Sequence, residues 1–274
     1  MEIWQAFMLG LIQGVAEFLP ISSSGHLTLF QMIYDLQEAP LTLAILLHMG
    51  TLLAVIAVYW REIWEMIRHP IRSDLKWLIL ATIPAVAVAL TMKSSIEAMF
   101  TGQFLGIAFL INSFVLLIAE SISRFRENHR EDVGWLNALA MGVMQAVAIM
   151  PGLSRSGSTI AGGLATGLRR KRAADFAFMM SIPAILGSAA MELKDIADEA
   201  TAASVSLTEQ FTLTIEQMGG VQPVLVGFAT AAILGFLAIK FMLYMIRRMS
   251  LNWFALYTGI LGCIIMVWQL LGNG

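Results

Sequence analysis

Two short polar stretches interrupt an apolar sequence, and they carry side chains that could bind and transform an anion. The first runs from Glu17 to His26 and contains a carboxylate, three serines, a glycine and an imidazole. The second runs from Pro151 to Thr159 and contains Arg155 between two serines. In hydrocarbon, each of these groups costs several kcal/mol of free energy unless it is hydrogen-bonded or hydrated. Such a concentration of polar groups therefore indicates a functional site.

The ligand that these groups fit best is a phosphate or a diphosphate. The guanidinium of Arg155 offers N–H donors in a planar fork that matches phosphate oxygens. Each Ser–Gly run precedes a predicted helix start, where free backbone N–H groups bind oxyanions. The predicted phosphate-binding residues are therefore Ser22, Ser24, Gly25, Ser154, Arg155, Ser156 and Gly157. Purely structural roles stay open as well: Arg155 could form an internal ion pair with Glu17, and Ser22 or Ser24 could be a helix cap.

A nucleophile and a proton-transfer group are also present in the first stretch. Ser22, Ser23 and Ser24 are the candidate nucleophiles, and His26 follows two to four residues later. An imidazole at that spacing can act as a general base or acid, or can orient a serine. A secondary transporter would need no such pair, so His26 favours an enzyme over a protein that only carries an anion.

Gln13 and Glu17 are the candidate metal ligands, because their i, i+4 spacing puts them on one face of the first predicted helix. Their oxygens suit a hard divalent cation, Mg²⁺ or Ca²⁺, that also binds substrate phosphates. Two oxygens are few for a metal site. His48 stands alone in a later apolar segment, so we assign it to hydrogen bonding between helices.

The composition is that of a membrane protein. Of 274 residues, 58% are hydrophobic and only 13% are charged, whereas soluble domains carry about 25% charged residues. Several apolar runs reach the roughly 20 residues needed to cross a bilayer. We therefore expect a polytopic protein surrounded by membrane lipids. No basic patch with interleaved aromatic residues suggests a nucleic-acid partner.

The predicted fold is all-α, with six transmembrane helices and two re-entrant helical hairpins in a single membrane domain, residues 1–274. In each hairpin a polar stretch breaks an apolar helix, because Pro, Ser and Gly interrupt helices. The spans are expected at about 41–60, 77–92, 102–120, 173–191, 221–246 and 252–271. Basic residues are typical of cytoplasmic loops. We therefore expect a cytoplasmic location for the basic clusters at 61–76, 121–134, 169–172 and 247–248. The acidic connector 192–220 and both termini are then expected outside the cell.

The two halves of the chain resemble each other. At a constant offset of 132 residues, eight of twenty positions are identical, including the Ser-x-Ser-Gly of both polar stretches. We expect an internal repeat, about 1–120 and 133–271, whose odd number of spans gives the halves opposite orientations. Inverted repeats with broken helices place their polar turns near the middle of the membrane. Secondary transporters share this architecture, so a transporter or flippase for a lipid phosphate or another anion stays open.

The two polar stretches resemble the paired signatures of one protein family. Residues 13–26 and 151–159 are similar to the motifs of the bacterial undecaprenyl-diphosphate phosphatases, the bacitracin-resistance family. Length, span pattern and motif order also agree, so the resemblance covers essentially the whole chain. It implies removal of the terminal phosphate of a polyprenyl diphosphate, which recycles the lipid carrier for cell-wall synthesis. It also implies an active site that opens to the outer side of the bacterial cytoplasmic membrane.

Carried over residue by residue, the resemblance implies that Glu17, Ser23, His26 and Arg155 are catalytic. We expect Arg155 to hold the diphosphate, Ser23 or a water molecule to attack the terminal phosphorus, and His26 to handle the proton. Gln13 occupies the family's first acidic position, so the predicted cation would be held by one carboxylate fewer. The sequence leaves the oligomeric state open, a homodimer included.

Overall fold

The computed structural model describes the chain apart from residues 35, 37–40, 93–95, 97–101, 126–129 and 273–274. Within the described residues the fold is all-α, with eleven helices and no strand. The helices of the first half are α1 (Ile3–Ala16), α2 (Ser23–Ile33), α3 (Leu41–Arg68), α4 (Leu75–Thr91) and α6 (Leu105–Phe125). Those of the second half are α7 (Trp135–Val147), α8 (Arg155–Ala165), α9 (Arg170–Ala203), α10 (Leu207–Gln217), α11 (Val221–Arg248) and α12 (Asn252–Leu270).

Within that part of the chain, five helices are long and apolar enough to cross a membrane, namely α3, α6, α9, α11 and α12. The prediction of a multi-pass membrane protein is therefore confirmed. The prediction of six spans is not confirmed, because α4 has only 17 residues, fewer than the roughly 20 that a full crossing requires. The acidic connector is largely helical, since α9 continues to Ala203 and α10 follows it.

The two polar stretches form turns between short helices. Residues 17–22 separate α1 from α2, and residues 148–154 separate α7 from α8. Ser22 and Ser154 are the N-caps, and their hydroxyls accept hydrogen bonds at 3.2 and 3.0 Å from the backbone N–H three residues later. Ser22 also has a positive φ of 72°, which is uncommon for residues other than glycine. Local capping therefore fixes where each helix resumes.

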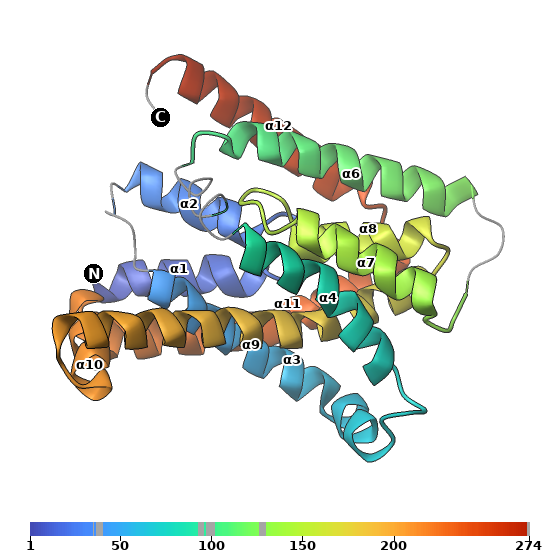
Figure 1. Cartoon of the computed structure of the whole chain (residues 1–274). Helices are drawn as coiled ribbons and strands as arrows, with labels where there is room; N and C mark the ends of the chain where they lie inside the picture. Colours follow the sequence, from blue (N-terminus) through green and yellow to red (C-terminus); the bar gives the residue numbers. More distant parts are fainter. Residues whose placement is uncertain (35, 37–40, 93–95, 97–101, 126–129, 273–274) are drawn as a thin grey trace.

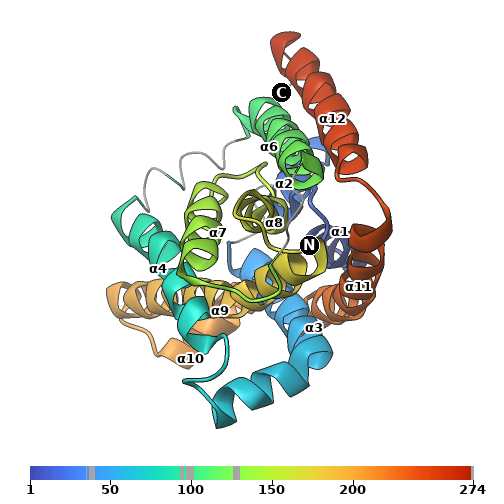
Figure 2. The same ribbon diagram turned by 90° about the vertical axis from the view of Figure 1, so that its right-hand side faces the viewer.

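The two broken helices lie towards opposite ends of the bundle. In Figure 1, α1 and α2 lie towards the end that holds α10 and both termini, whereas α7 and α8 lie towards the other end. Figure 2, which looks along the bundle, shows α8 surrounded by other helices. The loop between α3 and α4, the start of α9 and the end of α11 gather at the second end (Figure 1), together with their basic residues. We call this the basic end.

Small residues let the short helices pack very closely against longer neighbours. A Cβ atom on Gly10 of α1 would lie 2.4 Å from the carbonyl oxygen of Gly227 in α11. A Cβ atom on Gly142 of α7 would lie 2.4 Å from the carbonyl oxygen of Ala81 in α4. In lipid, where the hydrophobic effect does not hold helices together, such close backbone contacts drive their association.

Replacing Gly10 with alanine should destabilise the protein, because the new Cβ atom would overlap a backbone oxygen in α11. Overpacking of this kind typically costs about 1–3 kcal/mol. Gly187→Ala in α9 is the matched control, since no atom of the residues that the structure describes lies within 4 Å of a Cβ there. Thermal unfolding in detergent should give a lower midpoint for Gly10→Ala than for Gly187→Ala. Equal midpoints would contradict the close packing of α1 on α11.

Candidate active site

Asn112, a fully buried residue of α6, ties the two polar turns together. Its Nδ2 donates to the carbonyl oxygen of Pro20 at 3.1 Å, and its Oδ1 accepts from the N–H of Ser154 at 2.9 Å. The hydroxyl of Ser156 also donates to the carbonyl oxygen of Leu19 at 3.0 Å. The turns from the two halves of the chain therefore share one hydrogen-bond network, as the sequence predicts.

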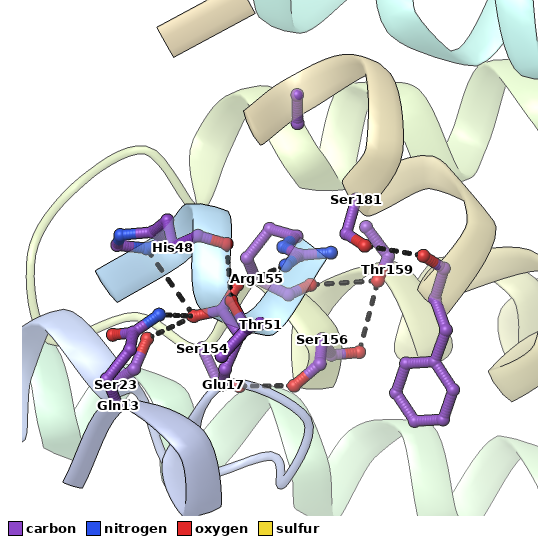
Figure 3. Close-up of polar contacts among 12 residues, drawn as sticks. Gln13, Glu17, Ser23, His48, Thr51, Ser154, Arg155, Ser156, Thr159 and Ser181 are labelled. Carbon is purple, nitrogen blue, oxygen red and sulfur yellow. Dashed lines mark hydrogen bonds and ion pairs between the residues drawn. The ribbon is translucent and has the colours of Figure 1, made fainter. Parts of the chain in front are cut away.

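Glu17 is the centre of the side-chain contacts between the turns (Figure 3). Its side chain is buried, and Oε1 forms an ion pair with Nη2 of Arg155. Oε2 accepts hydrogen bonds from Ser23 Oγ at 2.6 Å and from Gln13 Nε2 at 3.0 Å. His48 of α3 is a further neighbour, with its Nε2 3.5 Å from Oε2. One carboxylate thus joins side chains from both halves of the chain.

Arg155 makes the ion pair with Glu17 that the sequence left open, but one of its donors is not used. Nη1 of Arg155 and Oε1 of Gln13 are both buried, and neither has a hydrogen-bond partner among the described residues. A buried polar group without a partner costs about 1–3 kcal/mol, and more when it is charged. A bound anion would satisfy the donor, and a cation that accompanies the anion would satisfy the acceptor.

The remaining predicted phosphate-binding residues stabilise the turns. In each turn the capping serine accepts from a glycine N–H and lies within 3.3 Å of the hydroxyl two residues later. The capping role is therefore confirmed for Ser22, and contact of these side chains with phosphate stays a prediction. The residues in the two capping networks are Ser22, Ser24, Gly25, Ser154, Ser156 and Gly157.

His26 makes its hydrogen bonds to groups other than Ser23. Its Nδ1–H donates to the carbonyl oxygen of Ser22 at 2.7 Å, and the hydroxyl of Tyr257 donates to its Nε2 at 2.7 Å. The rings of His26 and Tyr257 also stack, with centroids 5.7 Å apart and an interplanar angle of 8°. Because Ser23 donates to Glu17, the carboxylate is the group positioned to take the proton of the serine.

Two residues that sequence reasoning did not place in the site reach it from other helices. His48 has Nδ1–H donating to the carbonyl oxygen of Ala44 at 2.6 Å, which leaves Nε2 facing Glu17. A lone histidine in an apolar span could have indicated that His48 belongs to the site, because ionisable residues inside membranes are commonly functional. Tyr257 is 231 residues from His26 in the sequence, and a tyrosine near a helix end gives no comparable signal.

The predicted metal ligands, Glu17 and Gln13, fit a cation that shares its ligands with a substrate. Within the described residues, no group of three or more His, Cys, Asp or Glu side chains could hold a metal ion. The carboxylate of Glu17 and the unpartnered Oε1 of Gln13 are hard oxygen donors that suit Mg²⁺ or Ca²⁺. These two donors would complete a site only with oxygens of a bound diphosphate.

Known proteins match this chain along almost its whole length. A family model described as bacitracin resistance protein BacA matches residues 6–264. An undecaprenyl-diphosphatase of Carboxydothermus hydrogenoformans is 40% identical, with 100% of both chains covered. An undecaprenyl-diphosphatase of Halothermothrix orenii is 35% identical, with 97% of this chain and 98% of the relative covered. Undecaprenyl-diphosphatase 3 of Bacillus cereus is 39% identical, with 97% of this chain and 96% of the relative covered. The chain therefore belongs to the bacitracin resistance protein BacA family, as its two polar stretches predict.

Proposed function

We propose that the chain hydrolyses undecaprenyl diphosphate to undecaprenyl phosphate and phosphate, which recycles the carrier for peptidoglycan synthesis and confers bacitracin resistance. Its relatives are named undecaprenyl-diphosphatase. The observation that carries the proposal is a serine hydroxyl 2.6 Å from a buried carboxylate, beside a guanidinium with an unused donor. A transporter needs anion-binding groups but no serine paired with a carboxylate, so the pair of Ser23 and Glu17 favours hydrolysis.

Arg155 and the backbone of both turns would bind the diphosphate. The buried Nη1 of Arg155 has no partner among the described residues. Helix geometry leaves the first N–H groups of α2 and α8 without a carbonyl partner inside their own helices. Both helix N-termini also favour negative charge. Donors from both halves of the chain could therefore hold one diphosphate, with the polyprenyl tail in the apolar space between the re-entrant helices.

Ser23 is the proposed nucleophile. As its oxygen bonds to the terminal phosphorus, its proton passes to Oε2 of Glu17, and the bond from that phosphorus to the bridging oxygen breaks. Undecaprenyl phosphate leaves with the bonding electron pair, and His26 handles proton exchange at the leaving oxygen. Water then attacks the phosphoserine, releases phosphate and restores the hydroxyl. A water molecule attacking in place of Ser23 would use the same carboxylate and give the same products.

We extend the proposal to a divalent cation, Mg²⁺ or Ca²⁺, held by Glu17, Gln13 and the diphosphate. Such an ion would offset the negative charge of the phosphoryl group during transfer. Gln13 brings an oxygen but no charge, so Glu17 supplies the carboxylate of the site. The affinity for the cation should depend strongly on this one position, because the number of charged ligands tunes the affinity of such sites.

The proposed architecture is an inverted repeat, about 1–120 and 133–271, with six crossings and two re-entrant hairpins in one domain. Gly10 and Gly142 are equivalent at the 132-residue offset and make equivalent close contacts, which supports the repeat. The shared serine caps support it too. The basic end would face the cytoplasm under the positive-inside rule. The site would then open to the outer side of the bacterial cytoplasmic membrane.

Ser23→Ala should reduce phosphate release from a polyprenyl diphosphate by about a thousandfold, because losing a nucleophile removes most of the chemical step. Ser188→Ala is the control, since the Ser188 hydroxyl is exposed on α9 and donates to the carbonyl oxygen of Ala184, away from Glu17. A phosphoserine trapped on Ser23 by rapid acid quench would assign the attack to the serine. Full activity in Ser23→Ala would remove Ser23 from the mechanism.

Chelation of divalent cations should abolish release, and Gln13→Glu should lower the cation concentration for half-maximal activity. A second carboxylate beside Glu17 would raise the charge of the site, so we expect a shift of about tenfold or more. Gln13→Ala should shift the same titration in the opposite direction. Activity that is indifferent to the chelator in all three proteins would exclude the cation.

Tyr257→Phe should lower kcat about three- to tenfold, because His26 would lose one neutral hydrogen bond worth about 0.5–1.5 kcal/mol. The KM should change less, since Tyr257 contacts the imidazole in the structure. Tyr244→Phe is the control, because that exposed ring packs under Arg248 at the basic end. Equal kinetics for both variants would show that Tyr257 does not position His26.

A further inference from the structure

A groove of about 580 Å³ lies between α3, α4 and α9, outside the candidate active site. Helices α3 and α4 each pack against α9, which forms the floor of the groove. Ile63 and Ile67 line it on α3, Leu78 and Val86 on α4, and Met179 on α9. None of the side chains around Glu17 takes part. The groove is therefore a separate feature of the molecule, with a lining of its own.

The lining of the groove is suited to a hydrocarbon chain. Among the described residues that line the groove, only Thr82 has a polar side chain, and its hydroxyl donates to the carbonyl oxygen of Leu78 at 2.7 Å. No lining side chain therefore offers a free polar atom to a ligand. On α4 the lining runs from Leu75 to Ala87, which at 1.5 Å per residue is about 18 Å. That length is close to one leaflet of a bilayer core about 30 Å thick.

Three exposed basic residues stand where the groove meets the loop between α3 and α4. Arg68 follows the lining residue Ile67, Lys76 follows the lining residue Leu75, and Arg72 lies in the loop between them. Within the described chain, no ion pair is found for any of the three basic residues. The nearby run 169–172 differs, because each of its four basic side chains pairs with an acidic side chain. The charge beside the groove is therefore available to a ligand.

Aromatic residues mark this rim as the level of lipid headgroups. The guanidinium of Arg68 lies over the ring of Trp64 at 4.8 Å, and the ammonium of Lys76 lies 5.0 Å from the ring of Trp77. Trp is enriched at membrane–water interfaces. α3 has non-helical backbone angles at Tyr59, and its last turns project from the bundle at the basic end (Figure 1). The groove thus runs from the interface into the hydrocarbon.

We propose that this groove binds one anionic phospholipid of the surrounding membrane. An acyl chain lies along α4 over α9, and the phosphate group is held by Arg68, Arg72 and Lys76. Each basic residue near a membrane surface strengthens binding of an anionic lipid by about fivefold, so three give roughly a hundredfold. A neutral lipid would fill the same groove without this gain, and a soluble phosphate would lack the chain.

The test compares retention of phosphatidylglycerol and phosphatidylcholine with identical acyl chains. Protein equilibrated with either lipid is passed through detergent, and the bound lipid is counted by mass spectrometry. We expect wild-type protein to prefer phosphatidylglycerol by roughly a hundredfold. Arg68→Gln/Arg72→Gln/Lys76→Gln should lose this preference. The control Arg247→Gln/Arg248→Gln removes charge from the basic end outside the groove and should keep the preference.

A second variant tests the contribution of the apolar groove independently of the three basic residues. Val86→Trp fills the groove at a position that is 44% exposed and leaves all three basic residues in place, so it should also release the lipid. Equal retention of both lipids by wild-type protein, or unchanged retention in the triple variant, would overturn the proposal. Displacement of phosphatidylglycerol by an equal concentration of polyprenyl phosphate would assign the groove to that lipid instead. Phosphate release is not measured, so the result stands apart from the proposed enzymatic activity.

Discussion

The largely buried ion pair between Glu17 and Arg155 is the constraint on which the rest of the structure depends. Moving each charge out of water costs several kcal/mol, and removing one partner typically costs about 3–5 kcal/mol because the other is stranded. Glu17 directly follows α1 and Arg155 begins α8, so the ion pair requires the end of α1 and the start of α8 to lie side by side. The caps and Asn112 hold the two turns in this arrangement. The ion pair therefore makes the fold of each half depend on the other.

The same pair leaves the site ready for a charged ligand. Glu17 neutralises one side of the guanidinium, while Nη1 of Arg155 and Oε1 of Gln13 are left without partners in the described structure. Buried unpaired groups are destabilising in the absence of a ligand. Close packing elsewhere, such as Gly10 against Gly227, helps to offset that cost. The packing of the surrounding helices thus stabilises the protein, and the polar groups that are free to bind a ligand lie where the two turns meet.

Features encoded by neighbouring residues could be predicted from the sequence, whereas features made by distant ones could not. The helix breaks, the Ser22 cap and the meeting of the two stretches follow from local Pro, Ser and Gly patterns and from the sequence similarity between the two halves. The contact of Tyr257 with His26 depends on how α12 packs, and no local pattern encodes it. Sequence spacing paired His26 with the serines, but Glu17 lies closer to Ser23 once the turn is folded. The predicted span 77–92 agrees with α4, Leu75–Thr91, to within two residues, but a helix of 17 residues is short for a full crossing.

The most direct test of the role of Arg155 is phosphate release by the purified protein from a polyprenyl diphosphate, compared with the variant Arg155→Ala. Binding of a non-hydrolysable diphosphate analogue to both proteins is measured alongside. We expect release by the wild type, and loss of both release and analogue binding in the variant, because the guanidinium holds the diphosphate. Release that persists in Arg155→Ala would contradict the central role of the ion pair. Tight analogue binding without any release by the wild type would favour a transporter.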